Sequence, residues 1–139
     1  MLASLKEVME MANQGNYAIG AFNTPNLECL LAVIHNAEEM NVPVIISHAQ
    51  LHEEIAPLDD IGPLMVYAAQ NAKVKVCVHL DHGEDLAYLE RALEIGFTSV
   101  MYDGSLYSYE ENVANTKKAV ALAAKYNADV EAEIGVMGG

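Results

Sequence analysis

The sequence repeats one kind of unit: a short apolar segment that ends in polar residues, followed by a segment with apolar residues at helical spacing. Five of these apolar segments predict β-strands, which recur at intervals of roughly 23 to 32 residues. The predicted strands cover residues 17–22, 42–46, 74–83, 97–102 and 129–134. This alternation of strands and helices indicates a parallel sheet with right-handed crossovers.

Two architectures are built from such units, an open doubly wound sheet and a (β/α)8 TIM barrel. No glycine-rich fingerprint follows the first predicted strand, and every strand ends in polar residues, so we favour the barrel. A barrel of this kind has about 250 residues, whereas the chain has 139. We therefore expect residues 1–139 to be the N-terminal part of a single TIM-barrel domain with about the first five βα units. A complete five-stranded domain is the alternative.

Local signals predict where the helices begin and end. Ser108 and Glu111 have the spacing of a capping box, and Gly96 is predicted to end the preceding helix. Pro25 and Pro63 are each predicted at the first position of a helix, where the missing N–H costs nothing.

Composition excludes several classes of partner. The net charge of −13 opposes binding to nucleic acid or to an anionic membrane. It does not oppose an anionic substrate, because a bound cation or backbone amides can supply positive charge locally. The longest uncharged run, residues 11–27, is too polar to span a membrane, and no secretory signal is evident. We expect a cytoplasmic protein in which Cys29 and Cys77 are buried thiols.

The ends of the predicted strands bring polar residues to one place. Side chains alternate between the two faces of a strand, so the third strand has two sets. Val74, Val76, Val78 and Leu80 face the helices, and Lys75, Cys77, His79 and Asp81 face the barrel interior. At the mouth of the barrel, where active sites of this fold are built, we expect Asn23, Ser47, Asp81, Asp103 and Glu133.

Three carboxylates beside His82 predict a metal site. Interior carboxylates are costly unless they are paired or bound to a cation, and the chain has only 7 basic residues. Oxygen and imidazole ligands suit divalent metals. Each residue also has a structural interpretation: Asp81 as a helix cap, Asp103 as part of a turn, His82 as a hydrogen-bonded histidine, and Glu133 as a solvent-facing residue of an edge strand.

His48 and His52 are four residues apart, the spacing of a metal-binding pair on a helix. Pro57 and the irregular pattern around them favour solvated loop residues instead.

The segment from Val78 to Gly83, Val-His-Leu-Asp-His-Gly, resembles the signature of the class II, metal-dependent ketose-bisphosphate aldolases (fructose- and tagatose-bisphosphate aldolases). Other segments resemble the same family in the same order along the chain. They are residues 17–23, 42–47, 99–104, 110–112, 130–135 and 138–139. The resemblance therefore covers the whole chain.

The resemblance implies a (β/α)8 barrel that reversibly cleaves a ketose 1,6-bisphosphate to dihydroxyacetone phosphate and glyceraldehyde 3-phosphate. Asp81 matches the acid that protonates the aldehyde oxygen during condensation. His82 matches the first of three histidines on a catalytic Zn²⁺, which stabilises the enediolate as a Lewis acid. Asp103 and Glu133 match positions that hold a second or resting cation in some members. Asn23 and Ser47 match substrate-contacting positions.

The family's other two zinc histidines, its phosphate-binding loops and its mobile-loop base lie beyond Gly139. We therefore expect the 139-residue chain to be inactive alone, and the full-length protein to be a homo-oligomer like other family members. Two further hypotheses remain open: a different metal-assisted lyase or isomerase on the same barrel, and a non-catalytic partner subunit of an aldolase.

Overall fold

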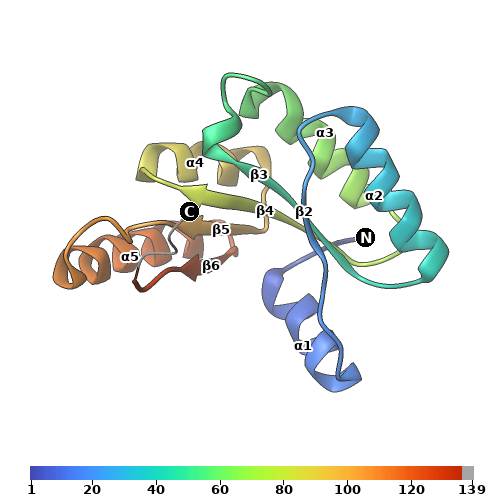
Figure 1. Ribbon diagram of the computed structural model, residues 1–139, viewed down its shortest axis with the longest axis horizontal. Coiled ribbons are helices and arrows are strands. Elements are labelled where there is room, and N and C mark those ends of the chain that lie inside the picture. Colours follow the sequence, from blue (N-terminus) through green and yellow to red (C-terminus); the bar gives the residue numbers. More distant parts are fainter. Residues whose placement is uncertain (136–139) are drawn as a thin grey trace.

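The fold is an all-parallel sheet in the computed structural model, which describes residues 1–135. Gly138 and Gly139, which belong to the last segment that resembles the aldolase family, lie outside the described residues. The strands are β1 (Leu2–Ala3), β2 (Ala21–Asn23), β3 (Val44–Ala49), β4 (Val76–Gly83), β5 (Ser99–Tyr102) and β6 (Asp129–Ala132). The spatial order is β2-β3-β4-β5-β6, and the short β1, which was not predicted, pairs with β4 (Figure 1). The order never reverses, as it would at the switch point of a doubly wound sheet.

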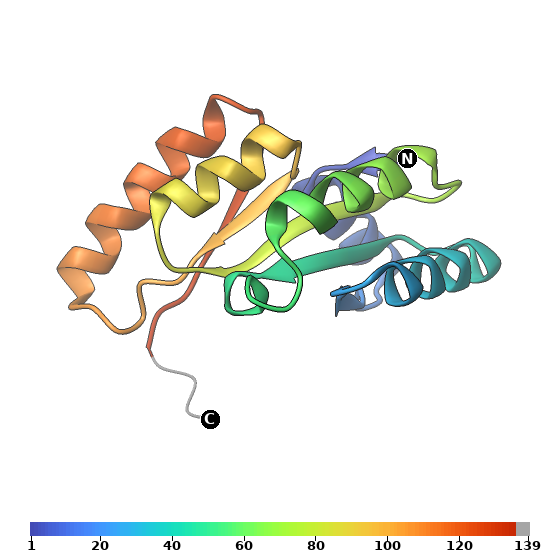
Figure 2. The ribbon, with the colours of Figure 1, turned by 90° about the horizontal axis from the view of Figure 1, so that it is seen from above.

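Helices connect consecutive strands. They are α1 (Leu5–Gly15), α2 (Leu27–Met40), α3 (Leu58–Asn71), α4 (Leu86–Ile95) and α5 (Tyr109–Ala124), with a short 3-10 helix η1 (Gln50–His52) after β3. Helices α3, α4 and α5 lie side by side along the sheet, while α1 lies apart from them (Figures 1 and 2). Val8 of α1 packs against Ile45 and Cys77, near the starts of β3 and β4, whereas the predicted site residues lie at the carboxyl ends of the strands.

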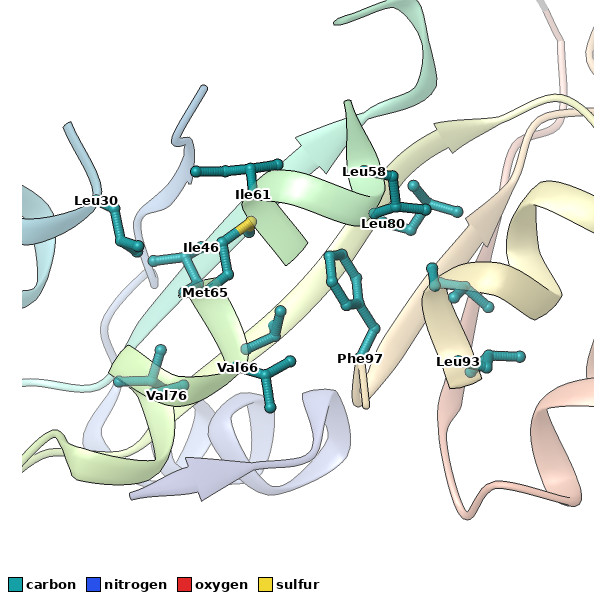
Figure 3. Close-up of a cluster of buried hydrophobic side chains, with 14 of the residues drawn as sticks. Leu30, Ile46, Leu58, Ile61, Met65, Val66, Val76, Leu80, Leu93 and Phe97 are labelled. Carbon is teal, nitrogen blue, oxygen red and sulfur yellow. The ribbon is translucent and has the colours of Figure 1, made fainter. Parts of the chain in front are cut away.

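The main core lies between the sheet and the helices (Figure 3). Val76, Val78 and Leu80 of β4 have no exposed area, and they pack in one cluster with residues of α2, α3 and α4. Cys77, from the opposite set, belongs to a separate small cluster with Val8 of α1. The predicted alternation of β4 is therefore confirmed on both faces. Burial of each large apolar side chain contributes about 1.5 to 3 kcal/mol.

Helix boundaries confirm some local signals and correct others. Gly96 ends α4 with a φ of 113°, and Ser108 and Glu111 form a complete capping box at α5. The prediction for Pro25 is wrong, because the Asn26 side chain accepts from the Cys29 N–H and α2 starts after it. The prediction for Pro63 is also wrong, because α3 begins at Leu58 and Pro63 lies inside the helix.

The burial of two residues differs from expectation. His48 lies inside β3 and is 1% exposed, so the prediction of a solvated loop residue is wrong. Its Nε2 lies 3.0 Å from the Tyr88 hydroxyl, which donates to Glu53 at 2.6 Å. Cys77 is buried as expected, whereas Cys29 is exposed.

Among residues 1–135, no helix is long and apolar enough to cross a membrane.

Candidate metal and proton-transfer site

A β-bulge at the end of β4 determines the direction of the site residues. Strict alternation would put Asp81 toward the interior and His82 on the helix side with Leu80. The register between β4 and β5 shifts between Leu80 and Gly83, and His82 has a φ of 47°. A positive φ is uncommon for a residue other than glycine, and bulges re-aim side chains next to active sites. Here the bulge lets His82 reach Asp103 on the neighbouring strand's end.

Gly83 closes the bulge at a position where a larger residue would force its neighbours to shift. A Cβ at this position would lie 2.4 Å from Leu89 Cδ1 and 2.9 Å from the carbonyl oxygen of Met101. The Gly83 carbonyl also accepts from the Asp103 N–H at 2.9 Å. The glycine thus allows the tight approach of β4, β5 and α4, and it holds Asp103 beside the bulge.

His82 and Asp103 form the closest polar pair of the site. Nδ1 of His82 lies 2.8 Å from Oδ2 of Asp103, while Oδ1 of Asp103 accepts from the Ser105 N–H at 3.0 Å. The bond to Asp103 raises the pKa of His82 against partial burial, and the charge of Asp81 adds to the rise. Partial burial opposes ionisation of Asp103, but the hydrogen bonds from Ser105 and His82 outweigh it and lower its pKa. The turn interpretation of Asp103 is confirmed, since one oxygen accepts from the Ser105 N–H in the turn and the other contacts His82.

The three predicted metal residues lie together. One ligand atom each from His82, Asp103 and Glu133 can be chosen so that all lie within 4.8 Å of one another. An ion held at about 2.1 Å from each atom needs separations of about 3 to 4 Å, so the three side chains would close slightly around a bound ion. One imidazole nitrogen and two carboxylates form a donor set that suits zinc and other divalent ions. The residues therefore fit a metal.

Asp81 lies beside this cluster and is held from the opposite side. Asn23 Nδ2 donates to Asp81 Oδ2 at 3.2 Å, and Asp81 Oδ1 lies 3.9 Å from His82 Nε2. Asp81 is not the helix cap, because Asp85 accepts from the Tyr88 N–H and caps α4. Its carboxylate is thus available for chemistry on the interior face.

Ser47 lies lower on the same face than Asp81. It pairs in register with Asn23 on one side and with His79 on the other, whereas Asp81 pairs with Ala49. Ser47 is 3% exposed. The structure therefore brings Asn23 to Asp81 but places Ser47 one layer deeper.

A second polar group lies beneath the cluster, and no role was predicted for it. His79 contacts Ser99 Oγ through Nδ1 at 2.9 Å and Glu131 Oε2 through Nε2 at 3.2 Å. The contact with His79 lowers the pKa of Glu131. These residues join β4, β5 and β6 below the site. Alternation contains the signal, because His79 precedes Asp81 by two residues and Glu131 precedes Glu133 by two.

Two curated proteins with similar sequences are named as aldolases. The chain is 39% identical over 141 residues to the 6-phospho-5-dehydro-2-deoxy-D-gluconate aldolase of Halalkalibacterium halodurans, covering 99% of this chain and 49% of that protein. It is 40% identical over 139 residues to the fructose-bisphosphate aldolase of Thermus caldophilus, covering 100% of this chain and 45% of that protein. The chain thus spans about half the length of the curated relatives it matches.

Solved structures agree in fold. The crystal structure of the YdjI aldolase from Escherichia coli K12 matches with a TM-score of 0.92 and 38% identity, over 99% of this chain and 54% of that one. A putative fructose-1,6-bisphosphate aldolase from Coccidioides immitis matches with a TM-score of 0.89 and 31% identity, over 97% of this chain and 47% of that one. These matches and the sequential strand order confirm the predicted architecture, part of a (β/α)8 barrel. A sequence model described as "Fructose-bisphosphate aldolase class-II" matches residues 3–139, so the chain belongs to the class II fructose-bisphosphate aldolase family.

Proposed function

We propose that this chain is the N-terminal part of a metal-dependent aldolase. The reaction is the reversible cleavage of a ketose 1,6-bisphosphate, of fructose or tagatose type, to dihydroxyacetone phosphate and glyceraldehyde 3-phosphate. One observation carries the proposal: the Asp81 carboxylate, held by Asn23, lies next to the cluster of His82, Asp103 and Glu133. Family membership supports the reaction type.

Asp81 is the proton-transfer group. It takes the proton of the substrate hydroxyl during cleavage and returns it to the aldehyde oxygen during condensation. Its position inside the barrel, with one oxygen held by Asn23 at 3.2 Å, leaves the other oxygen to face substrate. A general acid or base must lie within hydrogen-bond reach of the proton that it transfers, and the hydrogen bond from Asn23 helps to orient Asp81.

His82 is the ligand of the catalytic Zn²⁺. When bound, the ion supplies a Lewis acid that stabilises negative charge on the substrate carbonyl oxygen. Because Asp103 raises the pKa of His82, and a histidine must be neutral to bind a metal, cation binding competes with protons and strengthens as the pH rises. Asp103 and Glu133 hold a second or resting cation, and Asn23 and Ser47 contact the substrate.

The rest of the site belongs to the remainder of the protein. Two more zinc histidines, the phosphate-binding loops and the mobile-loop base come from residues that follow in the complete (β/α)8 barrel domain. The complete enzyme is a cytoplasmic homo-oligomer that binds phosphorylated sugars and neither nucleic acid nor membrane. The 139-residue chain alone is inactive, because it supplies His82 but not the other two histidines of the catalytic zinc site, which normally has three protein ligands.

A second candidate substrate follows from the relatives. One protein 39% identical to this chain is named for 6-phospho-5-dehydro-2-deoxy-D-gluconate, whereas others are named for fructose bisphosphate. The shared reaction type is an aldol cleavage of a phosphorylated sugar. The alternative is therefore an aldolase of the same mechanism with a different phosphorylated substrate.

The test uses the complete enzyme and a coupled assay for triose phosphate. Fructose 1,6-bisphosphate, tagatose 1,6-bisphosphate and 6-phospho-5-dehydro-2-deoxy-D-gluconate are compared by kcat/KM before and after chelation. We expect cleavage of one bisphosphate, loss of activity on chelation and recovery with Zn²⁺. Activity that survives complete chelation would remove the metal from the mechanism, and no activity on any of the three would favour a non-catalytic subunit or another reaction on this barrel.

A further inference from the structure

Asn112, in the second turn of α5, contacts the backbone of a proposed metal ligand. Its Nδ2 donates to the carbonyl oxygen of Glu133 at 2.8 Å, and Thr116 Oγ1 donates to its Oδ1 at 3.2 Å. An amide has one acceptor oxygen and one donor nitrogen, and these two bonds use both. A flipped amide would set oxygen against the Glu133 carbonyl, so the orientation is determined. The side chain is buried, with 8% exposure.

The same amide packs against the turn that follows the other carboxylate ligand. A Cβ at Gly104 would lie 2.3 Å from Asn112 Oδ1 and 2.8 Å from a ring carbon of Tyr102. Space is the reason for glycine here, since the backbone at Gly104 does not have a positive φ. The turn after Asp103 can therefore approach the Asn112 amide only because residue 104 lacks a side chain.

The start of α5 sets the position of Asn112. Ser108 Oγ accepts from the Glu111 N–H at 3.3 Å, and the Ser108 carbonyl accepts from the Asn112 N–H at 2.8 Å. The capping box thus determines where the first turn begins, and Asn112 follows directly after it. The β5–β6 ladder ends at Tyr102 and Ala132, so Asn112 contacts the chain just beyond the last paired residues.

We propose that Asn112 is a positioning residue that sets the separation of the Asp103 and Glu133 carboxylates and thereby the cation affinity of the cluster. The inference rests on the proposed function, because it requires those residues to bind a cation. Asn112 touches neither substrate nor metal. It ties the end of β6 to the turn after β5, and the two carboxylates project from these two places. Partners that orient metal ligands typically contribute 10- to 100-fold to metal affinity.

The test measures cation affinity directly in the complete enzyme. Apo protein is titrated with Zn²⁺ and with Mn²⁺ by calorimetry, for the wild type and for Asn112→Ala, Gly104→Ala and Thr116→Val. We expect Asn112→Ala and Gly104→Ala to raise the Kd by about 10- to 100-fold. The first removes the Asn112 amide that donates to Glu133, and the second displaces it. Thr116→Val keeps the Asn112 amide but removes the hydroxyl that donates to its Oδ1, so the amide can rotate. This variant should give a smaller loss of cation affinity.

Asn36→Ala is the matched control. It removes a side-chain amide bond to a helix carbonyl, that of Ala32 at 2.7 Å on α2, away from the site. Its Kd should equal that of the wild type. In Asn112→Ala, excess cation should restore kcat, which a general loss of structure would not permit.

The outcomes separate this inference from the proposed function. If the wild type binds no divalent cation, both are overturned. If the wild type binds and the folded Asn112→Ala protein binds equally tightly, only the role of Asn112 is overturned. If Asn112→Ala fails to fold by circular dichroism, Thr116→Val decides, and an unchanged Kd in that variant contradicts the proposal.

Discussion

Nδ1 of His82 lies 2.8 Å from Oδ2 of Asp103, although the two residues are 21 positions apart and strict side-chain alternation along β4 would turn His82 away. The contact depends on the positive φ of His82 and on the register shift of β4. A non-glycine residue in the left-handed region costs of order 1 to 3 kcal/mol and persists where surrounding structure holds it, often at functional sites. Here the bulge converts a strand end into a polar cluster.

Replacement of Asp81 tests the proton transfer. In the complete enzyme, Asp81→Asn keeps the shape of the side chain but removes its basicity, so kcat should fall at least about 10²-fold. Asp60→Asn, at an exposed position of α3, serves as the control and should keep full activity. A normal turnover rate for Asp81→Asn would exclude Asp81 from the mechanism.

Gly83→Ala tests the close approach at the bulge. The new Cβ would lie 2.4 Å from Leu89 Cδ1 and 2.9 Å from a backbone oxygen, and overpacking of this kind costs about 1 to 3 kcal/mol. The free energy of unfolding, from urea denaturation, should fall by that amount. Gly20→Ala is the comparison, because its Cβ would meet the exposed ring of Phe22, which can move aside. Equal losses in both variants would contradict the argument.

Tyr88→Phe tests the buried chain from His48 to Glu53. The Tyr88 hydroxyl donates to Glu53 at 2.6 Å and lies 3.0 Å from His48 Nε2. Its removal leaves a buried imidazole nitrogen without a partner, at a cost of about 1 to 3 kcal/mol. Thermal or urea unfolding measures the loss. Tyr67→Phe, with Tyr67 67% exposed, should have almost no effect, and equal stability of Tyr88→Phe and wild type would refute the interpretation.

The pH dependence of stability should also report on His48. Burial is the main cause that lowers the pKa of His48 from its ordinary 6.5. The folded protein therefore binds the proton less readily than the unfolded chain, and protonation favours unfolding. The contribution is present above pH 6.5 and is lost as the pH falls through the lowered pKa.

The measurement is urea unfolding of wild type and His48→Phe from pH 7.5 downward. The difference between the two proteins should change below about pH 6.5, the unfolded-state value. His35→Phe, on α2, is the control for loss of a histidine elsewhere. A constant difference between wild type and His48→Phe across the range would show that His48 does not contribute this dependence.

Several features were predictable because they depend on neighbouring residues alone. The alternation of β4 places Val76 and Val78 against helices and Asp81 on the interior face, since successive side chains of a strand point to opposite faces. The capping box at Ser108 and the glycine end at Gly96 are likewise local hydrogen-bond and dihedral effects. Pro63 shows the limit of such local signals. The proline predicted a helix start at residue 63, but α3 begins at Leu58, whose N–H donates to the Glu53 side chain.

The amino-acid pattern by itself determined the parallel βα order, the residues on each face of the strands, and the resemblance to class II aldolases. Only the tertiary structure decided that His82 turns toward Asp103, that His48 is buried against Tyr88, and that Asn112 reaches Glu133. The physical reason is the range of the interactions. Side-chain alternation is set within a strand, whereas a bulge, a buried polar partner or a shared turn depends on strands and helices that meet only when the chain has folded.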